Sequence, residues 1–222
     1  MTVLTDGVTN TVLKAILFDF DLTLADSLHL GNAAIAELEA LHGVTLQHLG
    51  AQEAWGMTPK EIVDEFLRQQ PELGRYTLQQ EVDDSLMRHY QPCQLRERQA
   101  LARLAAAGIM LGIITSNTRK AVLPAVKASG ITIPFIRGYE DRPPGTGKGF
   151  SLLEALGLYG LLPEQMAFVG DHPKDIAAAR DAGVMAIAIA TGHHSKAELS
   201  LCKPDCIVES IAALESVVFG RK

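Results

Sequence analysis

Short apolar runs alternate with longer segments rich in Ala and Leu over much of the chain. The apolar runs show no polar face and most end in Gly, Asp, Thr or Ser, which is typical of buried strands. They lie at residues 14–20, 110–115, 133–136, 166–170 and 184–190. The segments between them predict helices at about 95–107, 119–129, 149–157 and 174–182.

Glycines mark the ends of three of these predicted helices. Gly108, Gly130 and Gly183 lie where a helix C-terminus favours a residue that tolerates positive φ. Alternating strands and helices indicate βαβ units, so we predict an α/β fold with a doubly wound parallel sheet and a Rossmann-like core. In such folds ligands bind at the carboxyl ends of the strands.

The stretch from about 28 to 92 breaks this alternation because it contains no convincing strand. Its pattern predicts helices at roughly 28–42, 59–69 and 77–90, with turns near Gly43, Gly56 and residues 71–74. We interpret it as an all-helical cap inserted after the first strand. The predicted domains are therefore a catalytic core of residues 1–27 and 93–222 and a cap of residues 28–92.

Composition narrows the class of protein further. The 222 residues are 47% hydrophobic, which suffices for one core and a small accessory domain, and the net charge is −6. No cluster of Lys and Arg stands out, which argues against nucleic acid or an anionic membrane as a partner.

The pattern shows neither a signal peptide in the first dozen residues nor a membrane span. Three sparse cysteines indicate reduced thiols, so we expect a cytoplasmic protein, and Cys202 and Cys206 lack zinc-site spacing.

Two acids follow the first strand. Asp19 and Asp21 are spaced so that both side chains can project from the strand end towards one site. Burying two like charges is costly unless a cation compensates, and Mg²⁺ is the usual hard cation with oxygen ligands. A helix cap is an alternative role for the nearby Asp26 or Ser27, but not for Asp19, which interrupts a strand with a charge.

The fourth strand also ends in an acid, in the sequence Gly170-Asp171, and Asp175 follows at the start of the next helix. Asp175 can also interact favourably with the helix dipole there. A single Gly-Asp pair is weak evidence by itself. Two acid-bearing strand ends in one parallel sheet are stronger evidence, because they can meet at one cation.

Two further segments carry groups that suit an anion. Thr115, Ser116 and Asn117 end the second strand, where hydroxyl and main-chain N–H groups can bind an anion or simply cap a helix. Lys148 lies in a loop that opens a helix and can supply a fixed positive charge, although a surface lysine is the ordinary alternative. The residues alone leave both alternatives open.

Taken together, these residues resemble the haloacid dehalogenase superfamily, and the likeness spans nearly the whole chain in the right order. The matching positions are residues 19–24 (Asp-Phe-Asp-Leu-Thr-Leu), Thr115, Lys148, and Gly170-Asp171 with Asp175. The position of the helical insert is similar to the cap of the phosphoglycolate phosphatase-like branch. Two residues depart from the family pattern: Leu22 replaces the usual Gly, and Gly149 replaces the usual Pro after the lysine.

The resemblance implies a magnesium-dependent phosphatase. Asp19 would be the nucleophile that forms an aspartyl-phosphate, and Asp21 the general acid and base. Mg²⁺ would be held by Asp19, Asp171 and the main-chain carbonyl of Asp21, while Asp175 would position Lys148 or a metal-bound water. The phosphoryl oxygens would be bound by Thr115, Ser116, Asn117 and Lys148. The substrate would be a small phosphorylated metabolite.

Three other functions would fit parts of this sequence. One is a phosphomutase of the same fold, which would return the phosphoryl group to a bound sugar. Another is a binding or regulatory protein with an inactive site, and the complete set of acids argues against this second alternative. A nucleotide-binding P-loop is suggested by residues 143–148 (Pro-Pro-Gly-Thr-Gly-Lys). The full motif needs Gly where Arg142 stands and Ser or Thr where Gly149 stands, so this reading is disfavoured.

The cap loop at residues 55–60 lies where related caps reach over the site. We predict that Thr58 and Lys60 discriminate among leaving groups, with a helix cap and a solvated lysine as the alternatives. Trp55 belongs either to the cap core or to the substrate site. His193 and His194 lie in a loop after the fifth predicted strand, where an ordinary loop role is favoured over a metal site, and the sequence leaves their role open. The sequence leaves the exact substrate and the oligomeric state open.

Overall fold

The computed structural model describes residues 12–46 and 56–220 of the protein, so Trp55 lies outside the described residues. Within them the chain forms a six-stranded parallel sheet in the order β3-β2-β1-β4-β5-β6, which confirms the predicted α/β fold. The strands are β1 (Ala15–Phe18), β2 (Met110–Ile114), β3 (Phe135–Arg137), β4 (Met166–Gly170), β5 (Met185–Ile189) and β6 (Cys206–Val208). The chain leaves β1 towards β2 and returns to β4 on the other side, so the strand order reverses beside β1. The loops after β1 and β4 therefore flank the crevice where such sheets bind ligands.

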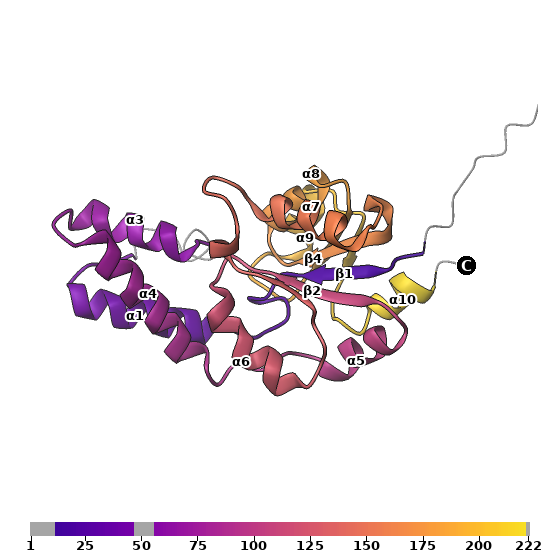
Figure 1. Ribbon diagram of the computed structural model, residues 1–222, viewed down its shortest axis with the longest axis horizontal. Coiled ribbons are helices and arrows are strands. Elements are labelled where there is room, and N and C mark those ends of the chain that lie inside the picture. Colours follow the sequence, from indigo (N-terminus) through magenta and orange to yellow (C-terminus); the bar gives the residue numbers. More distant parts are fainter. Residues whose placement is uncertain (1–11, 47–55, 221–222) are drawn as a thin grey trace, which may run out of the picture.

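Helices cover both faces of the sheet (Figure 1). One face packs against α5 (Arg98–Ala106), α6 (Arg119–Ser129) and α10 (Leu214–Phe219), and the other against α7 (Lys148–Tyr159), α8 (Pro173–Asp181) and α9 (Lys196–Leu201). Strand β1 shows the alternation clearly, because Ile16 and Phe18 belong to the first apolar cluster and Ala15 and Leu17 to the second. Burial on both faces explains why the strands are continuous apolar runs. Short 3-10 turns lie at Tyr139–Asp141 and Pro163–Gln165.

The predicted glycine positions at the helix ends are confirmed. Gly130 is the C-cap of α6 with φ of 71°, and Gly108 and Gly183 follow α5 and α8 with φ of 85° and 73°. Residues with a Cβ are strained in this left-handed region, so the glycines allow the chain to leave each helix and enter the next strand.

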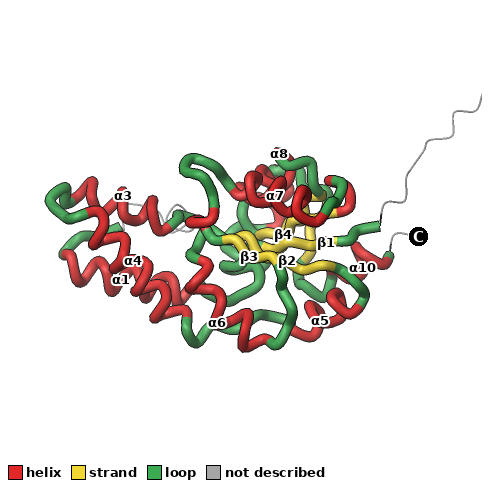
Figure 2. Tube along the Cα trace, viewed as in Figure 1, coloured by secondary structure: helices red, strands yellow, loops and turns green. Residues whose placement is uncertain are grey.

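The segment after β1 forms α1 (Leu28–His42), α3 (Pro59–Gln69) and α4 (Arg75–Tyr90), which agree with the three helices predicted there. They lie together at one end of the molecule, with α4 packed against both α1 and α3 (Figures 1 and 2). The outgoing and returning linkers run side by side, since the N–H of Arg96 donates to the carbonyl of Leu24 at 2.7 Å. The division into a core and a cap at residues 28–92 stays a prediction.

Strand β6 was not predicted as a strand. It has only three residues, two of them half-buried, and it pairs with β5 at the edge of the sheet. An edge strand this short carries too little apolar pattern to be recognised. No helix in the described ranges is long and apolar enough to cross a membrane.

Candidate active site

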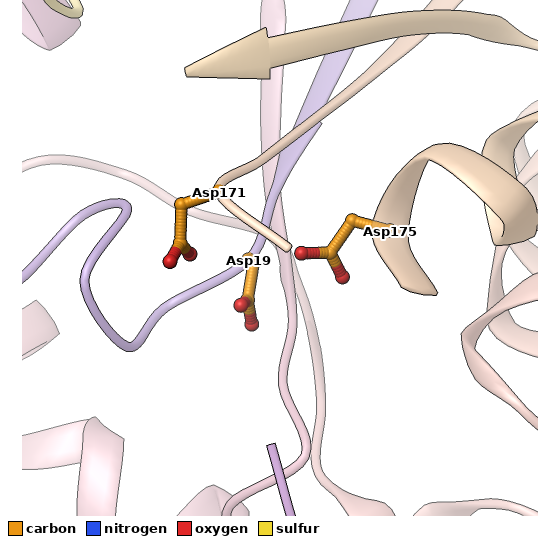
Figure 3. Close-up of side chains that lie close together, drawn as sticks. All are labelled: Asp19, Asp171 and Asp175. Carbon is orange, nitrogen blue, oxygen red and sulfur yellow. The ribbon is translucent and has the colours of Figure 1, made fainter. Parts of the chain in front are cut away.

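Three buried aspartates meet at the carboxyl edge of the sheet. Asp19 directly follows β1 and Asp171 directly follows β4, and these strands are neighbours in register, so the two acids lie side by side. Asp175 points to them from the first turn of α8 (Figure 3). One carboxylate oxygen of each acid lies within 4.8 Å of the others, and all three residues are at most 7% exposed. The two acid-bearing strand ends therefore come together as the sequence suggested.

Two glycines make room for these carboxylates. A Cβ on Gly170 would clash with the carboxylate of Asp175, and a Cβ on Gly192 would clash with that of Asp171. The hydroxyl of Thr23 also donates a hydrogen bond of 2.9 Å to Oδ1 of Asp171. Gly192 was not among the predicted site residues, because its role depends on the approach of two loops that are distant in sequence.

Lys148 is the cation within this acidic cluster. Its Nζ lies 2.8 Å from Oδ1 of Asp19 and 2.7 Å from Oδ1 of Asp175. Burial lowers the pKa of Lys148, but the two adjacent carboxylates outweigh burial, so its pKa is raised and it stays protonated. Of the two alternatives for Lys148, the structure places it in the site rather than on the surface.

One lysine does not balance three buried acids. Burial raises the pKa of Asp19 well above its usual range, even though Lys148 lowers it, and burial followed by the charge of Asp175 raises the pKa of Asp171 to about 7. Both shifts reflect the cost of burying negative charge. The cluster therefore fits a divalent cation with oxygen ligands, which would relieve that cost.

The carboxyl group of Asp21 lies apart from this cluster. Its Oδ1 accepts hydrogen bonds of 2.6 Å from both Ser27 Oγ and Tyr90 Oη, and its Oδ2 lies 3.5 Å from Nδ2 of Asn117. Ser27 occupies the N-cap position of α1, but its side chain makes no capping hydrogen bond. Its hydroxyl therefore binds Asp21 and does not cap the helix. Asp26 forms an ion pair with Arg96 at 3.2 Å. Tyr90 was not predicted, because no sequence motif marks it.

The turn after β2 is built from the predicted anion-binding residues. The hydroxyl of Thr115, which is fully buried, accepts a hydrogen bond of 2.9 Å from the main-chain N–H of Asn117. The N-cap of α6 is the next residue, Thr118, whose hydroxyl accepts from the N–H of Ala121 at 3.1 Å. The helix-capping alternative therefore applies to Thr118, and Ser116 and Asn117 line a cavity instead.

This cavity has a volume of about 980 Å³ and lies between the aspartates and the inserted helices. Thr58 and Lys60 line it together with Asp19 and Asp21. Thr58 also caps α3 in a reciprocal arrangement with Glu61, and Lys60 forms an ion pair with Asp64 at 2.8 Å. Both residues therefore have structural partners as well as a place on the cavity wall.

Arg142 also lines this cavity, although no motif in the sequence marks it as a site residue. Its Nη2 donates a hydrogen bond of 3.2 Å to the main-chain oxygen of Thr115, and among the described residues it forms no ion pair. Burial lowers the pKa of Arg142, and the negative charge of Asp19 opposes this shift. In the sequence Arg142 stands out only as a mismatch to a P-loop, and the ion pairs of Lys148 with two aspartates give that motif no support.

The two loop histidines also line the cavity. The ring of His194 packs edge-on against that of His172, with 4.7 Å between centroids. His172 accepts a hydrogen bond of 3.0 Å at Nδ1 from the N–H of Lys174, and burial lowers its pKa to about 4. The imidazole of His172 is therefore neutral near pH 7.

Comparisons with known proteins show which family the chain resembles. A family model described as haloacid dehalogenase-like hydrolase matches residues 16–189. The chain is 32% identical to a phosphoglycolate phosphatase of Chromobacterium violaceum, over 91% of this chain and 95% of that protein. It is 28% identical to one of Escherichia coli K12, over 90% of each.

Solved structures share the fold. The structure of CbbY from Rhodobacter sphaeroides in complex with phosphate has a TM-score of 0.76 at 23% identity, covering 91% of this chain and 96% of that one. A phosphonoacetaldehyde hydrolase-like protein of Oleispira antarctica has a TM-score of 0.80 at 18% identity, covering 99% and 96%. At these identities the likeness concerns the fold alone.

Proposed function

The chain belongs to the haloacid dehalogenase-like hydrolase family, and from this membership we propose that it is a magnesium-dependent phosphatase of a small phosphorylated metabolite. Relatives named phosphoglycolate phosphatase support the reaction class. The observation that carries the proposal is the buried cluster of Asp19, Asp171 and Asp175 around Lys148, beside a cavity that Asp21 also lines.

In the proposed reaction an oxygen of the Asp19 carboxylate attacks phosphorus, and the bond between phosphorus and the ester oxygen breaks. Asp21 gives its proton to the departing oxygen and later takes one from the water that hydrolyses the aspartyl-phosphate. Lys148, Thr115 and the N–H groups of Ser116 and Asn117 bind the phosphoryl oxygens. Mg²⁺, held by Asp19, Asp171 and the main-chain carbonyl of Asp21, would offset the repulsion between carboxylate and phosphate. Asp175 positions Lys148, as their 2.7 Å contact supports.

We propose that Arg142 supplies a second cation for the anionic substrate. Lys148 is already paired with two carboxylates, whereas Arg142 bonds only a main-chain oxygen among the described residues. A guanidinium can donate two parallel hydrogen bonds to phosphate oxygens. Thr58 and Lys60 would contact the leaving group from the opposite wall of the cavity, away from the phosphoryl group.

A screen of phosphate monoesters with Mg²⁺, read by release of free inorganic phosphate, tests this function. We expect activity that disappears with a chelator, returns with Mg²⁺ and is poorly supported by Ca²⁺, which takes more ligands at longer distances. Asp19→Asn should abolish turnover, while Asp84→Asn, at an exposed acid of α4, should not. Full activity in chelator, or a tenth of the activity left in Asp19→Asn, would contradict the mechanism. A sugar phosphate isomerised without release of phosphate would indicate the mutase instead.

A further inference from the structure

Two hydroxyl groups share one oxygen of Asp21. Tyr90 Oη and Ser27 Oγ each lie 2.6 Å from Oδ1. Both donors are buried, with Tyr90 2% and Ser27 0% exposed. A tyrosine hydroxyl carries its proton near pH 7, so Tyr90 Oη donates this hydrogen bond to Asp21.

The two donors lie at the two ends of the inserted helical segment. Ser27 immediately precedes α1, and Tyr90 is the last residue of α4, 63 positions later in the sequence. The linkers are held together close by, through a main-chain bond from Arg96 to Leu24 at 2.7 Å and a bridge between Ala25 and Leu95. The Tyr90 ring also packs near Phe20, with 6.5 Å between ring centroids. The hydroxyl of Tyr90 therefore has a fixed position relative to the loop that carries Asp21.

We propose that Tyr90 is a positioning residue for the acid–base carboxyl group of Asp21, acting together with Ser27. The inference rests on the proposed function, in which Asp21 carries the transferred proton. Two donors on Oδ1 fix the rotation of the carboxyl group. They leave Oδ2, which accepts only a long hydrogen bond of 3.5 Å from Nδ2 of the cavity residue Asn117, as the oxygen that holds the proton.

The proton transfer that this arrangement serves is balanced within one step. As the bond from Asp19 oxygen to phosphorus forms, the bond from phosphorus to the ester oxygen breaks. The Oδ2–H proton of Asp21 moves to that ester oxygen, so the alcohol leaves neutral and Asp21 becomes a carboxylate. A misplaced Oδ2 therefore harms only those reactions in which the leaving oxygen needs the proton.

Esters with different leaving groups can distinguish a positioning role of Tyr90 from a purely structural one. A dinitrophenolate departs readily without protonation, whereas an ordinary phenolate benefits strongly from it. General acid catalysis contributes about 10²–10⁴-fold where it is needed. A variant that only reduces the fraction of folded enzyme lowers kcat/KM by the same factor for every ester.

The experiment compares kcat/KM for 2,4-dinitrophenyl, 4-nitrophenyl and phenyl phosphate in the full-length enzyme with Mg²⁺. Four variants are measured: Asp21→Asn, Tyr90→Phe, Ser27→Ala, and the matched control Tyr76→Phe at an exposed tyrosine of the same helix. For Tyr90→Phe we expect a loss of about tenfold or more on phenyl phosphate and under about threefold on the dinitrophenyl ester. Tyr76→Phe should match the unaltered enzyme on all three.

The outcomes distinguish this inference from the proposed function. If Asp21→Asn lowers kcat/KM by the same factor for all three esters, Asp21 is not the general acid, and the inference about Tyr90 fails with it. Asp21→Asn can show a larger loss of kcat/KM on phenyl phosphate than on the dinitrophenyl ester while Tyr90→Phe shows the same loss on all esters, or none. In that case only the positioning role of Tyr90 is overturned. Should Tyr90→Phe fail to fold, Ser27→Ala decides by the same comparison.

Discussion

The Nζ of Lys148 lies 2.8 Å from Oδ1 of Asp19, and 90% of each side chain is removed from solvent. This pair joins the first turn of α7 to the end of β1, two elements that are far apart in the sequence. A second contact, 2.7 Å to Asp175, ties the same ammonium to α8. The lysine is therefore the cation that compensates the burial of these two acids.

Replacing this lysine should destabilise the protein as well as inactivate it. Lys148→Met leaves Asp19 and Asp175 buried without their cation, and breaking a buried pair costs about 3–5 kcal/mol. We expect the free energy of unfolding in urea to fall by about that amount without metal, and to recover in part with Mg²⁺. Lys127→Met, at an exposed position of α6, is the matched control and should change little. A Lys148→Met protein as stable as the control would show that the ion pairs contribute no stability.

Gly192→Ala should weaken metal binding. The added Cβ would clash with the carboxylate of Asp171 and force it out of the cluster. Losses of about 10–100-fold in Mg²⁺ affinity are typical when the support of a ligand is disturbed. Titration calorimetry with Mg²⁺ measures the effect. Gly157→Ala, in α7 with no atom within 4 Å of the new Cβ, should keep the affinity; equal affinities in both variants would contradict the prediction.

Arg142→Ala should weaken binding of the phosphate group. Hydrogen bonds to a charged group contribute about 1.5–3 kcal/mol, so we expect both KM and the inhibition constant of inorganic phosphate to rise about tenfold or more. Arg98→Ala, on the exposed surface of α5, serves as the control. Unchanged phosphate inhibition in Arg142→Ala would exclude the arginine from phosphate binding.

Leu22 adopts a backbone conformation that suits glycine, with φ of 59°, and its side chain is only 6% exposed. Leu22→Ala and Leu22→Gly both lose the buried side chain, but only the alanine keeps the strain of about 1–2 kcal/mol. We therefore expect Leu22→Gly to be the more stable of the two in urea unfolding. At Leu104, inside α5, the order should reverse because glycine disfavours a helix. Alanine more stable at both positions would show that Leu22 is unstrained.

Cys93 should be the slowest of the three cysteines to react. Burial raises its pKa to about 11, and only 6% of the residue is exposed, whereas Cys202 and Cys206 are half-buried. At pH 8 about one Cys93 in a thousand is a thiolate, and each further pH unit raises that fraction about tenfold. Peptide mass spectrometry after iodoacetamide treatment measures the rates. In urea, where the chain is unfolded, Cys93 and Cys202 should be labelled at similar rates. Equal labelling rates of the two in the folded protein would contradict the prediction.

Five of the six strands of the sheet, most of the helices, and the placing of the candidate acids at strand ends could be predicted because they depend on local sequence. An apolar run buried on both faces reads directly as a strand of a parallel sheet. An acid at the end of such a run is conspicuous, as at Asp19 and Asp171. Parallel strands bring their carboxyl ends to one edge, so the meeting of these acids followed from topology alone.

Other features depended on which surfaces approach one another, and no local pattern encodes that. Gly192 is required because a distant loop brings the Asp171 carboxylate against it, and Arg142 matters because its loop returns to the carbonyl of Thr115. Tyr90 reads in the sequence as an ordinary aromatic residue at the end of a helix. Its hydroxyl acquires a partner only when the returning linker places it 2.6 Å from Asp21. The sequence thus determined which chemical groups the protein carries and at which strand ends they lie, because strand and helix periodicity is local. The tertiary structure alone decided which groups hold them in place, because that depends on distances between segments far apart in the chain.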